Sequence, residues 1–147
     1  MVNGADTPGT LELARVYRAA RYRIDASQPL FLRLDEPNPG LSRFSPDGSL
    51  SGVFLTACNP YSRCLRPAVN ARRLRALQRA IGWLGHGWLP GCALDPLETW
   101  PEEPSVWVPG MPAGTGHALA RRFGQNDFIV CDALGVPRLA WVQRHRA

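Results

Sequence analysis

Hydrophobic positions along the chain follow two periods, one of two residues and one of three to four residues. Tyr22 and Ile24 alternate with polar neighbours, which predicts a half-buried strand. Residues 52–59 form a nearly continuous apolar run, the pattern of a central strand buried on both faces. Residues 11–20 show helical spacing, and residues 35–52 are rich in Pro, Gly, Ser and Asp, which indicates a loop or hairpin.

Two helices are predicted between the later strands. The first runs from Pro67 to Leu84, since proline is favoured at a helix start and Gly85 and Gly87 follow its end. The second follows Thr115 as its N-cap and closes at Gly124. The apolar residues that we expect to face the core are Leu74, Leu77, Ile81 and Leu84 on the first helix, and Leu119 and Phe123 on the second.

The order of these elements predicts the fold class. Further strands are expected at residues 87–96, 105–110, 127–133 and 138–143. Residues 52–133 then read β-α-β-β-α-β, the split βαβ order of the ferredoxin-like fold, in which two helices cover one face of an antiparallel sheet. We therefore predict an α+β protein with additional N- and C-terminal strands. Residues 1–9 would be a flexible tail, and residues 10–147 a single ferredoxin-like domain.

Composition narrows the class of protein. The chain has 147 residues, of which 45% are hydrophobic and 20% are charged, as expected for one globular domain. It has no apolar run of membrane-spanning length, and its first ten residues lack the apolar segment of a signal peptide. We expect a cytoplasmic protein that does not enter a membrane.

The cysteines and histidines do not form a metal-binding pattern. Cys58, Cys64, Cys92 and Cys131 include no CxxC pair, and the three histidines are scattered. Structural zinc sites need closely spaced ligands. We expect reduced and mostly buried thiols.

The positive charge comes from arginine alone. All 17 basic residues are arginines, and the net charge is +5 with a pI near 9.6. No Asp or Glu lies between Cys58 and Gly82. The guanidinium group binds phosphate oxygens in pairs, which favours a polyanionic partner such as DNA or RNA. The alternative is that the arginine-only charge reflects a GC-rich genome, whose codons favour arginine over lysine.

Several separated blocks of sequence carry a family resemblance. They are TACNPYS at residues 56–62, Asn70 with Arg73, WPEEPSVWVPG at residues 100–110, and RRFGQNDFIV at residues 121–130. In this order, and preceded by the tyrosine-bearing segment ARVYRAARYRI, they resemble the bacterial domain of unknown function 3293 from about Leu11 to Val142. One departure is Asp127, where a small apolar residue is expected. If Asp127 faces the core, it needs a partner. The resemblance implies no activity, so function has to be argued from the residues.

The segment after the predicted central strand is polar and basic. A strand that ends in a polar loop and opens a helix offers backbone N–H groups and the positive end of a helix dipole to an anion. We predict that phosphate or nucleic acid is bound by Asn59, Ser62, Arg63, Arg66, Asn70, Arg72, Arg73, Arg75 and Arg79, with the amides of Gln125 and Asn126 available to a base or a ribose. The alternative is that the amides and the hydroxyl cap turns while the arginines form a solvated helix face.

Carboxylates offer a second candidate site. Glu102 and Glu103 belong to an acidic stretch, and Asp25 follows the first predicted strand. Carboxylates that converge can hold Mg²⁺ or Mn²⁺ and activate water. We predict Asp25, Glu102 and Glu103 as metal ligands, and Asp25, Ser62 and Glu103 as catalytic residues. Against this, adjacent glutamates on an extended strand point to opposite faces.

These features lead to one main hypothesis and two alternatives. The leading hypothesis is a nucleic-acid-acting protein, with a metal-dependent nuclease activity similar to that of small CRISPR-associated ferredoxin-like nucleases, which share the element order only. The first alternative is a non-catalytic module that binds nucleic acid or phosphate. The second is an interaction protein in which open sheet edges pair into a homodimer. Trp88, Trp100, Trp107 and Trp141 either stack on bases or pack in the core and at the edges.

Overall fold

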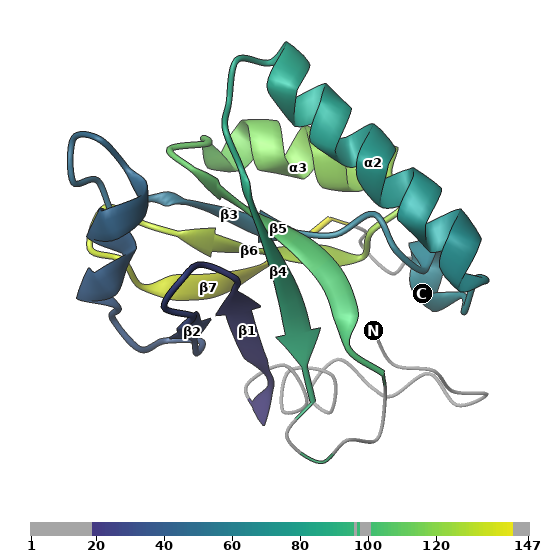
Figure 1. Cartoon of the computed structure of the whole chain (residues 1–147), viewed down its shortest axis with the longest axis horizontal. Coiled ribbons are helices and arrows are strands. Elements are labelled where there is room, and N and C mark those ends of the chain that lie inside the picture. The colour runs from purple at the N-terminus through teal and green to yellow at the C-terminus, as the bar shows by residue number, and fades with distance from the viewer. Residues whose placement is uncertain (1–18, 96, 98–100, 143–147) are drawn as a thin grey trace.

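The computed structural model describes residues 19–95, 97 and 101–142, and it forms one curled antiparallel sheet with helices (Figure 1). The predicted α+β class is confirmed. The tail at residues 1–9, most of the predicted helix at residues 11–20, and Trp100 lie outside the described residues. The strands are β1 (Arg21–Ile24), β2 (Leu30–Leu32), β3 (Gly52–Leu55), β4 (Leu89–Leu94), β5 (Glu103–Pro109), β6 (Asp127–Cys131) and β7 (Pro137–Trp141). The helices are α2 (Pro67–Trp83) and α3 (Ala113–Arg122), with short 3₁₀ helices η1 (Pro39–Phe44) and η2 (Pro60–Ser62).

The seven strands lie in the order β2-β1-β4-β5-β3-β6-β7, and each neighbouring pair is antiparallel. Strand β3 lies between β5 and β6, and every one of its residues is buried, as its apolar run predicts. The loop after β2 donates two backbone hydrogen bonds, from Asp35 to the carbonyl of Pro137 and from Asn38 to the carbonyl of Gly135. These bonds link the β2 side of the sheet to the turn between β6 and β7, so the sheet curls.

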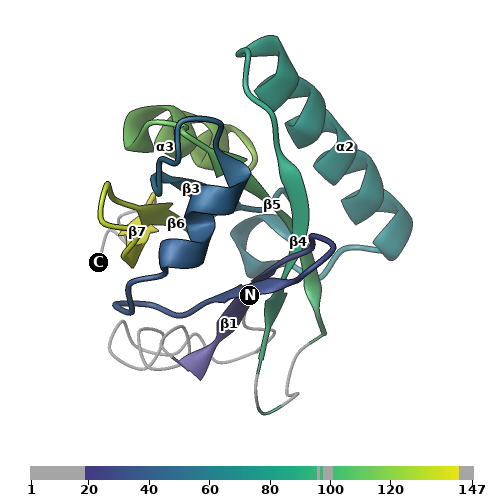
Figure 2. The ribbon, with the colours of Figure 1, turned by 60° about the vertical axis from the view of Figure 1, so that its left-hand side comes forward.

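Each face of the sheet has its own hydrophobic core. Helices α2 and α3 lie on one face, where Leu77 and Leu119 pack with Val106 (Figures 1 and 2). On the opposite face Leu41 of η1 packs in a second core that contains the largest fully buried side chain, Trp107. The polar loop that connects β3 to α2 lies at the end of the sheet, beside the first of these cores.

Two predictions about the helices need correction. Helix α3 begins at Ala113 with Pro112 as its N-cap, so Thr115 lies inside the first turn and does not cap it. Proline fits there because its fixed φ suits the residues around a helix start. Leu84, which we expected to face the core, is exposed and follows the last residue of the helix, Trp83. The rest of the predicted range of α2 is confirmed. Within the part of the chain that the structure describes, no helix has the length and apolarity needed to cross a membrane.

Candidate functional site: a pocket beside the start of α2

The loop that follows β3 has an unusual backbone. Asn59, Tyr61 and Ser62 have φ angles of 48°, 53° and 59°, in the left-handed region. Residues other than glycine seldom adopt this conformation, which costs about 1–3 kcal/mol each and is found where surrounding contacts enforce it, often at functional sites. The contacts that hold this loop therefore matter for the site.

The amide side chains of Asn59 and Asn70 supply the first set of contacts. Asn70 Nδ2 donates to Asn59 Oδ1 at 2.8 Å, and the backbone N–H of Asn59 donates to Asn70 Oδ1 at 2.9 Å. Asn59 Oδ1 also accepts from the backbone N–H of Leu65 at 3.0 Å. The two amides thus tie the loop to the first turn of α2, and these polar atoms are already engaged within the protein.

Residues 123–126 hold the loop from the other side. Gly124, with a φ of 70°, ends α3 and accepts a hydrogen bond from the backbone N–H of Tyr61 at 2.8 Å. Gln125 Nε2 donates to the carbonyl of Cys58 at 3.0 Å, and Asn126 Nδ2 donates to Ser62 Oγ at 3.1 Å. The amides that we predicted for a base or a ribose are therefore bonded to the loop.

Arg73 completes this support. Its Nε donates to the carbonyl of Ala57 at 2.7 Å, and its Nη2 donates to the carbonyl of Phe123 at 2.6 Å. The guanidinium thus joins the segment after β3 to the end of α3. This geometry makes Arg73 a structural residue rather than a free anion ligand.

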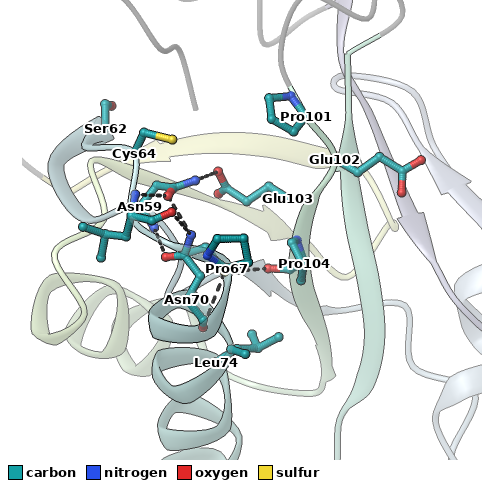
Figure 3. A pocket seen from close by; sticks show the side chains of 13 residues that line it. Asn59, Ser62, Cys64, Pro67, Asn70, Leu74, Pro101, Glu102, Glu103 and Pro104 are labelled. Atoms are coloured by element: carbon teal, nitrogen blue, oxygen red, sulfur yellow. Dashed lines mark hydrogen bonds between the residues drawn. The ribbon is translucent and has the colours of Figure 1, made fainter.

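A pocket of about 410 Å³ lies beside this loop, between the start of α2 and the start of β5 (Figure 3). This volume falls in the usual range for small-molecule sites. Most of the wall is apolar, with prolines and leucines from three segments of the chain. The lining residues are Cys58, Asn59, Ser62, Cys64, Leu65, Pro67, Asn70, Ala71, Leu74, Pro101, Glu102, Glu103 and Pro104.

Glu103 is the buried charge of this pocket. It is only 4% exposed, and its Oε2 accepts a hydrogen bond from Asn59 Nδ2 at 3.4 Å, as Figure 3 shows. Among the residues that the structure describes, its Oε1 has no hydrogen-bond partner. A buried carboxylate oxygen without a partner is costly, so a hydrogen-bond donor of a ligand that reached it would relieve that cost.

Burial raises the pKa of Glu103, and the nearby Asp127 raises it further, while the hydrogen bond from Asn59 opposes the change. Asp127 is itself buried at the start of β6, and it does not lack an interaction partner. The expectation that a core-facing Asp127 needs a partner is therefore met. The pKa shift means that Glu103 keeps its proton to higher pH than an exposed glutamate does.

Two cysteines and a serine also line the pocket. The Cys58 thiol is buried and makes weak contacts to the carbonyls of Asn70 and Pro104, and burial raises its pKa. Cys64 is exposed at the pocket. Ser62 Oγ accepts its hydrogen bond from Asn126, so it is held in place. All four cysteines are free thiols, as predicted, but Cys64 is exposed and Cys92 is only partly buried.

The three carboxylates that we predicted as metal ligands belong to two groups. Arg23 donates from Nε to Asp25 Oδ1, and its Nη2 lies 3.8 Å from Glu102 Oε2. Glu103 instead contacts Asn59, and Figure 3 shows Glu102 directed away from it. Among the described residues no group of three or more His, Cys, Asp or Glu side chains is placed to hold a metal ion. A divalent cation would need ligands beyond these three, and the Mg²⁺ or Mn²⁺ site stays a prediction.

The remaining predicted arginines lie at the surface around the pocket and along α2. Those that are exposed are Arg63, Arg66, Arg72, Arg75 and Arg79. None of them lines the pocket, but Arg63 and Arg66 are chain neighbours of residues that do. Of the predicted tryptophans, Trp107 is buried in the core, and Trp88 and Trp141 are partly exposed.

Sequence reasoning missed the pocket walls and the most exposed tryptophan, Trp83. It also grouped Glu103 with Asp25 and Glu102, whereas in the structure Glu103 contacts Asn59 and the other two lie near Arg23. A signal was present in the chain. Glu103, Ser105 and Trp107 alternate along one strand, and all three are buried. The alternation places Glu103 on the inward side, where a carboxylate needs a specific reason.

Comparison with known protein families gives a match over the middle of the chain. The family described as "Protein of unknown function (DUF3293)" matches residues 55–127, from the end of β3 to the start of β6. No curated protein and no solved structure gives a significant match to the chain. The matched range contains the loop after β3, helix α2, Glu103 and the turn after α3, and so most of the pocket and its supports. The resemblance to the DUF3293 family that the sequence shows is thus confirmed over these residues.

Proposed function

We propose that this protein binds a nucleotide, either free or as one unit of a nucleic acid, with the base in the pocket beside α2 and the phosphate at the arginine-bearing rim. The observation that carries this proposal is the Oε1 of Glu103, which has no hydrogen-bond partner in the described part of the chain and belongs to a residue lining an apolar pocket of about 410 Å³. A planar base has apolar faces and polar edges, which fits such a pocket.

The carboxylate selects the kind of base. When ionised, Glu103 can only accept hydrogen bonds, so it pairs with a base that presents an N–H group. Adenine, cytosine and guanine carry an exocyclic amino group, whereas uracil and thymine offer only the ring N3–H, which lies between two carbonyl oxygens that a carboxylate repels. The walls formed by Leu65, Leu74 and Pro104 would contact the faces of the base. We therefore expect bases with an amino group to bind more tightly than uracil.

The rim supplies the charge for a phosphate. Arg63, Arg66 and Arg72 are exposed and immediately adjoin lining residues in the chain. No acidic residue lies between Cys58 and Leu94, so none in this segment competes for them. Exposed arginines bind phosphate through paired donors. This part of the proposal keeps Arg63, Arg66 and Arg72 as phosphate ligands and assigns Asn59, Asn70 and Arg73 to the support of the loop.

The finer fold description is also a proposal. Residues 52–131 have the features of a ferredoxin-like unit, because β5 lies between the two strands joined by α2, and β3 lies between the two joined by α3. Three expectations stay predictions. They are metal-dependent cleavage of a bound nucleic acid, pairing of edge strands into a homodimer, and a cytoplasmic location.

The test is binding of AMP, CMP, GMP and UMP to the purified protein by calorimetry. We expect binding of the nucleotides with amino-bearing bases, weaker binding of UMP, and a loss of about tenfold or more in Glu103→Ala, because a charge-assisted hydrogen bond is lost. The matched control is Glu36→Ala, which removes an exposed glutamate outside the pocket and should change nothing. Equal affinity in the two variants, or no binding of any nucleotide, would contradict the proposal.

Cleavage is followed in the same samples. Single-stranded DNA and RNA are incubated with Mg²⁺, Mn²⁺ or EDTA, and the products are separated on a gel. Cleavage that EDTA stops and that Glu103→Ala lacks would make the protein a metal-dependent nuclease. Binding without products would make it a binding module.

A further inference from the structure

The helical face of the molecule carries basic residues and no acidic ones. Neither α2 nor α3 contains an Asp or a Glu, and the same is true of the whole segments 58–94 and 104–126. The two helices carry Arg72, Arg73, Arg75, Arg79, Arg121 and Arg122. With Arg73 committed to backbone carbonyls, the others form an exposed positive layer over the sheet.

A second hollow, of about 470 Å³, lies between the two helices at the end of α2. Trp83, which is 90% exposed, stands at this hollow. Arg79 and Arg122 line it from the two helices. Within the described chain neither arginine forms an ion pair with a carboxylate, and Arg122 lies over the ring of Phe123 at 5.6 Å. An exposed indole can stack on a base, and neighbouring guanidinium groups that form no ion pair among the described residues can contact its phosphates.

The positions along α2 relate this hollow to the pocket. With 100° per residue, Pro67, Ala71 and Leu74 fall on one flank of the helix, next to the pocket, and Ala76 and Ala80 fall on the opposite flank, next to the hollow. The outer face between these flanks carries Arg72, Arg75 and Arg79. The exposed arginines therefore form a path from one site to the other.

The separation of the two sites sets the size of the ligand. From Asn70 to Trp83 the helix rises about 20 Å, at about 1.5 Å per residue. A single nucleotide cannot reach both ends. A strand with stacked bases about 3.4 Å apart covers this length in about six nucleotides.

We infer that the ligand is a single-stranded nucleic acid that crosses the outer face of α2, with one base in the pocket and another stacked on Trp83 in the hollow between α2 and α3. This inference rests on the proposed nucleotide site and names its substrate class. The bases of a single strand are free to stack, whereas those of a duplex are paired and covered, so the strand must be unpaired.

The test compares ligands of different length on two variants. Fluorescence anisotropy of a labelled oligonucleotide of about 12 units gives the affinity for the strand, and calorimetry gives the affinity for AMP. In Trp83→Ala we expect the affinity for the oligonucleotide to fall about tenfold, since one stacked base is lost, and the affinity for AMP to stay unchanged. Leu134→Ala, which removes another exposed apolar side chain on the turn between β6 and β7, is the matched control.

The salt dependence gives a second, independent measurement. For single strands the slope of log K against log salt changes by about 0.7 for each phosphate contact. The double variant Arg79→Ala with Arg122→Ala should therefore lower the slope by about 1.4, with no effect on AMP.

The outcomes separate this inference from the function on which it rests. AMP binding that needs Glu103, with no gain in affinity for the longer ligand, would contradict the inference of a single-stranded ligand and support the proposed nucleotide site. Oligonucleotide binding that needs Trp83 but not Glu103 would support binding on the helical face and contradict the proposed nucleotide site in the pocket. Equal competition by a polyglutamate peptide or by duplex DNA would overturn the inference, because the face would then recognise negative charge alone.

Discussion

Asn59 and Asn70 stand 11 positions apart in the chain, and each bonds to the other across the start of α2. The amide of Asn70 accepts from the backbone of Asn59 and donates to its side chain, so one side chain fixes both the backbone and the rotamer of the other. This pair holds Asn59 in its left-handed conformation and keeps Asn59 Nδ2 directed at Glu103. The geometry of the pocket therefore depends on Asn70, whose side-chain amide is hydrogen-bonded within the protein.

Replacement of Asn70 should damage both stability and the site. In Asn70→Ala the backbone N–H of Asn59 and the side-chain oxygen of Asn59 lose partners in a half-buried setting, and we expect a loss of about 2–3 kcal/mol in the free energy of unfolding. Urea unfolding measures it. The control is Gln78→Ala on the same helix, which should stay within about 0.5 kcal/mol of the wild type. Equal stability of the two variants would show that the Asn pair is not the support described here.

Arg73 should be the arginine of α2 that matters most for stability. Arg73→Met keeps much of the aliphatic stem and removes two hydrogen bonds to backbone carbonyls, at a cost of about 3 kcal/mol. Its neighbour Arg72 is exposed, and Arg72→Met should cost no more than about 0.5 kcal/mol. Chemical denaturation of both variants checks this. If Arg72→Met is the more damaging change, the structural role belongs to the outer face of the helix instead.

Glu103 should make stability depend on pH. Its pKa is raised in the folded protein, so the folded state holds this proton at pH values where the unfolded chain has released it. The penalty is absent below the unfolded pKa of about 4.5 and grows as the pH rises through the folded pKa. Glu103→Gln removes the charge, so we expect it to be more stable than wild type at about pH 8 and equal near pH 4.

Unfolding by urea at several pH values tests this point. A difference between Glu103→Gln and wild type that does not change with pH would indicate altered packing rather than the cost of a buried charge. We expect Glu103→Gln to be more stable and to lose nucleotide binding, since ligand sites commonly retain groups that destabilise the fold.

The cysteines should react in an order set by their surroundings. Burial raises the pKa of Cys131 to about 12 and raises that of Cys58, whereas Cys64 is exposed. The thiolate is the reactive form, so alkylation of the native protein should reach Cys64 first and Cys131 only after unfolding. Peptide mapping by mass spectrometry identifies the sites.

Because Cys64 lines the pocket, its labelling also reports on binding. A nucleotide that occupies the pocket should slow the reaction at Cys64 and leave the rate at the half-buried Cys92, which lies outside the lining, unchanged. Protection of both thiols alike would point to a general change in the protein, and no protection would place the nucleotide elsewhere.

Local sequence patterns predicted several helices and strands of the fold. The helical spacing of Leu74, Leu77 and Ile81 and the proline at the start gave the range of α2 to within one residue. The apolar run at residues 52–59 predicted a buried central strand, but only residues 52–55 are in the sheet. Directly after the strand, Thr56 donates its hydroxyl to the carbonyl of Pro104, and this contact between residues 48 positions apart cannot be read from a local pattern.

The candidate site was predictable in composition but not in roles. Asn59, Asn70, Gln125 and Asn126 were identified as a set, and the structure does bring them together around one loop. Their amides support the loop because they bond to one another, to the Ser62 hydroxyl and to backbone groups of the loop. Glu103 and Trp83 show the reverse error. Burial leaves Glu103 with a free acceptor, and exposure leaves Trp83 free to bind, and both depend on tertiary structure.

The absence of acidic residues from α2 and α3 gives the molecule a fixed electrical polarity. The carboxylates of the described residues lie on strands, turns and loops, so these two helices present arginines with no acidic residue among them. Such a field acts over about 8 Å at physiological ionic strength, which is far enough to turn an approaching polyanion before any contact forms. The helices would therefore set the rate and the orientation of capture, and added salt would slow association before it loosened the bound complex.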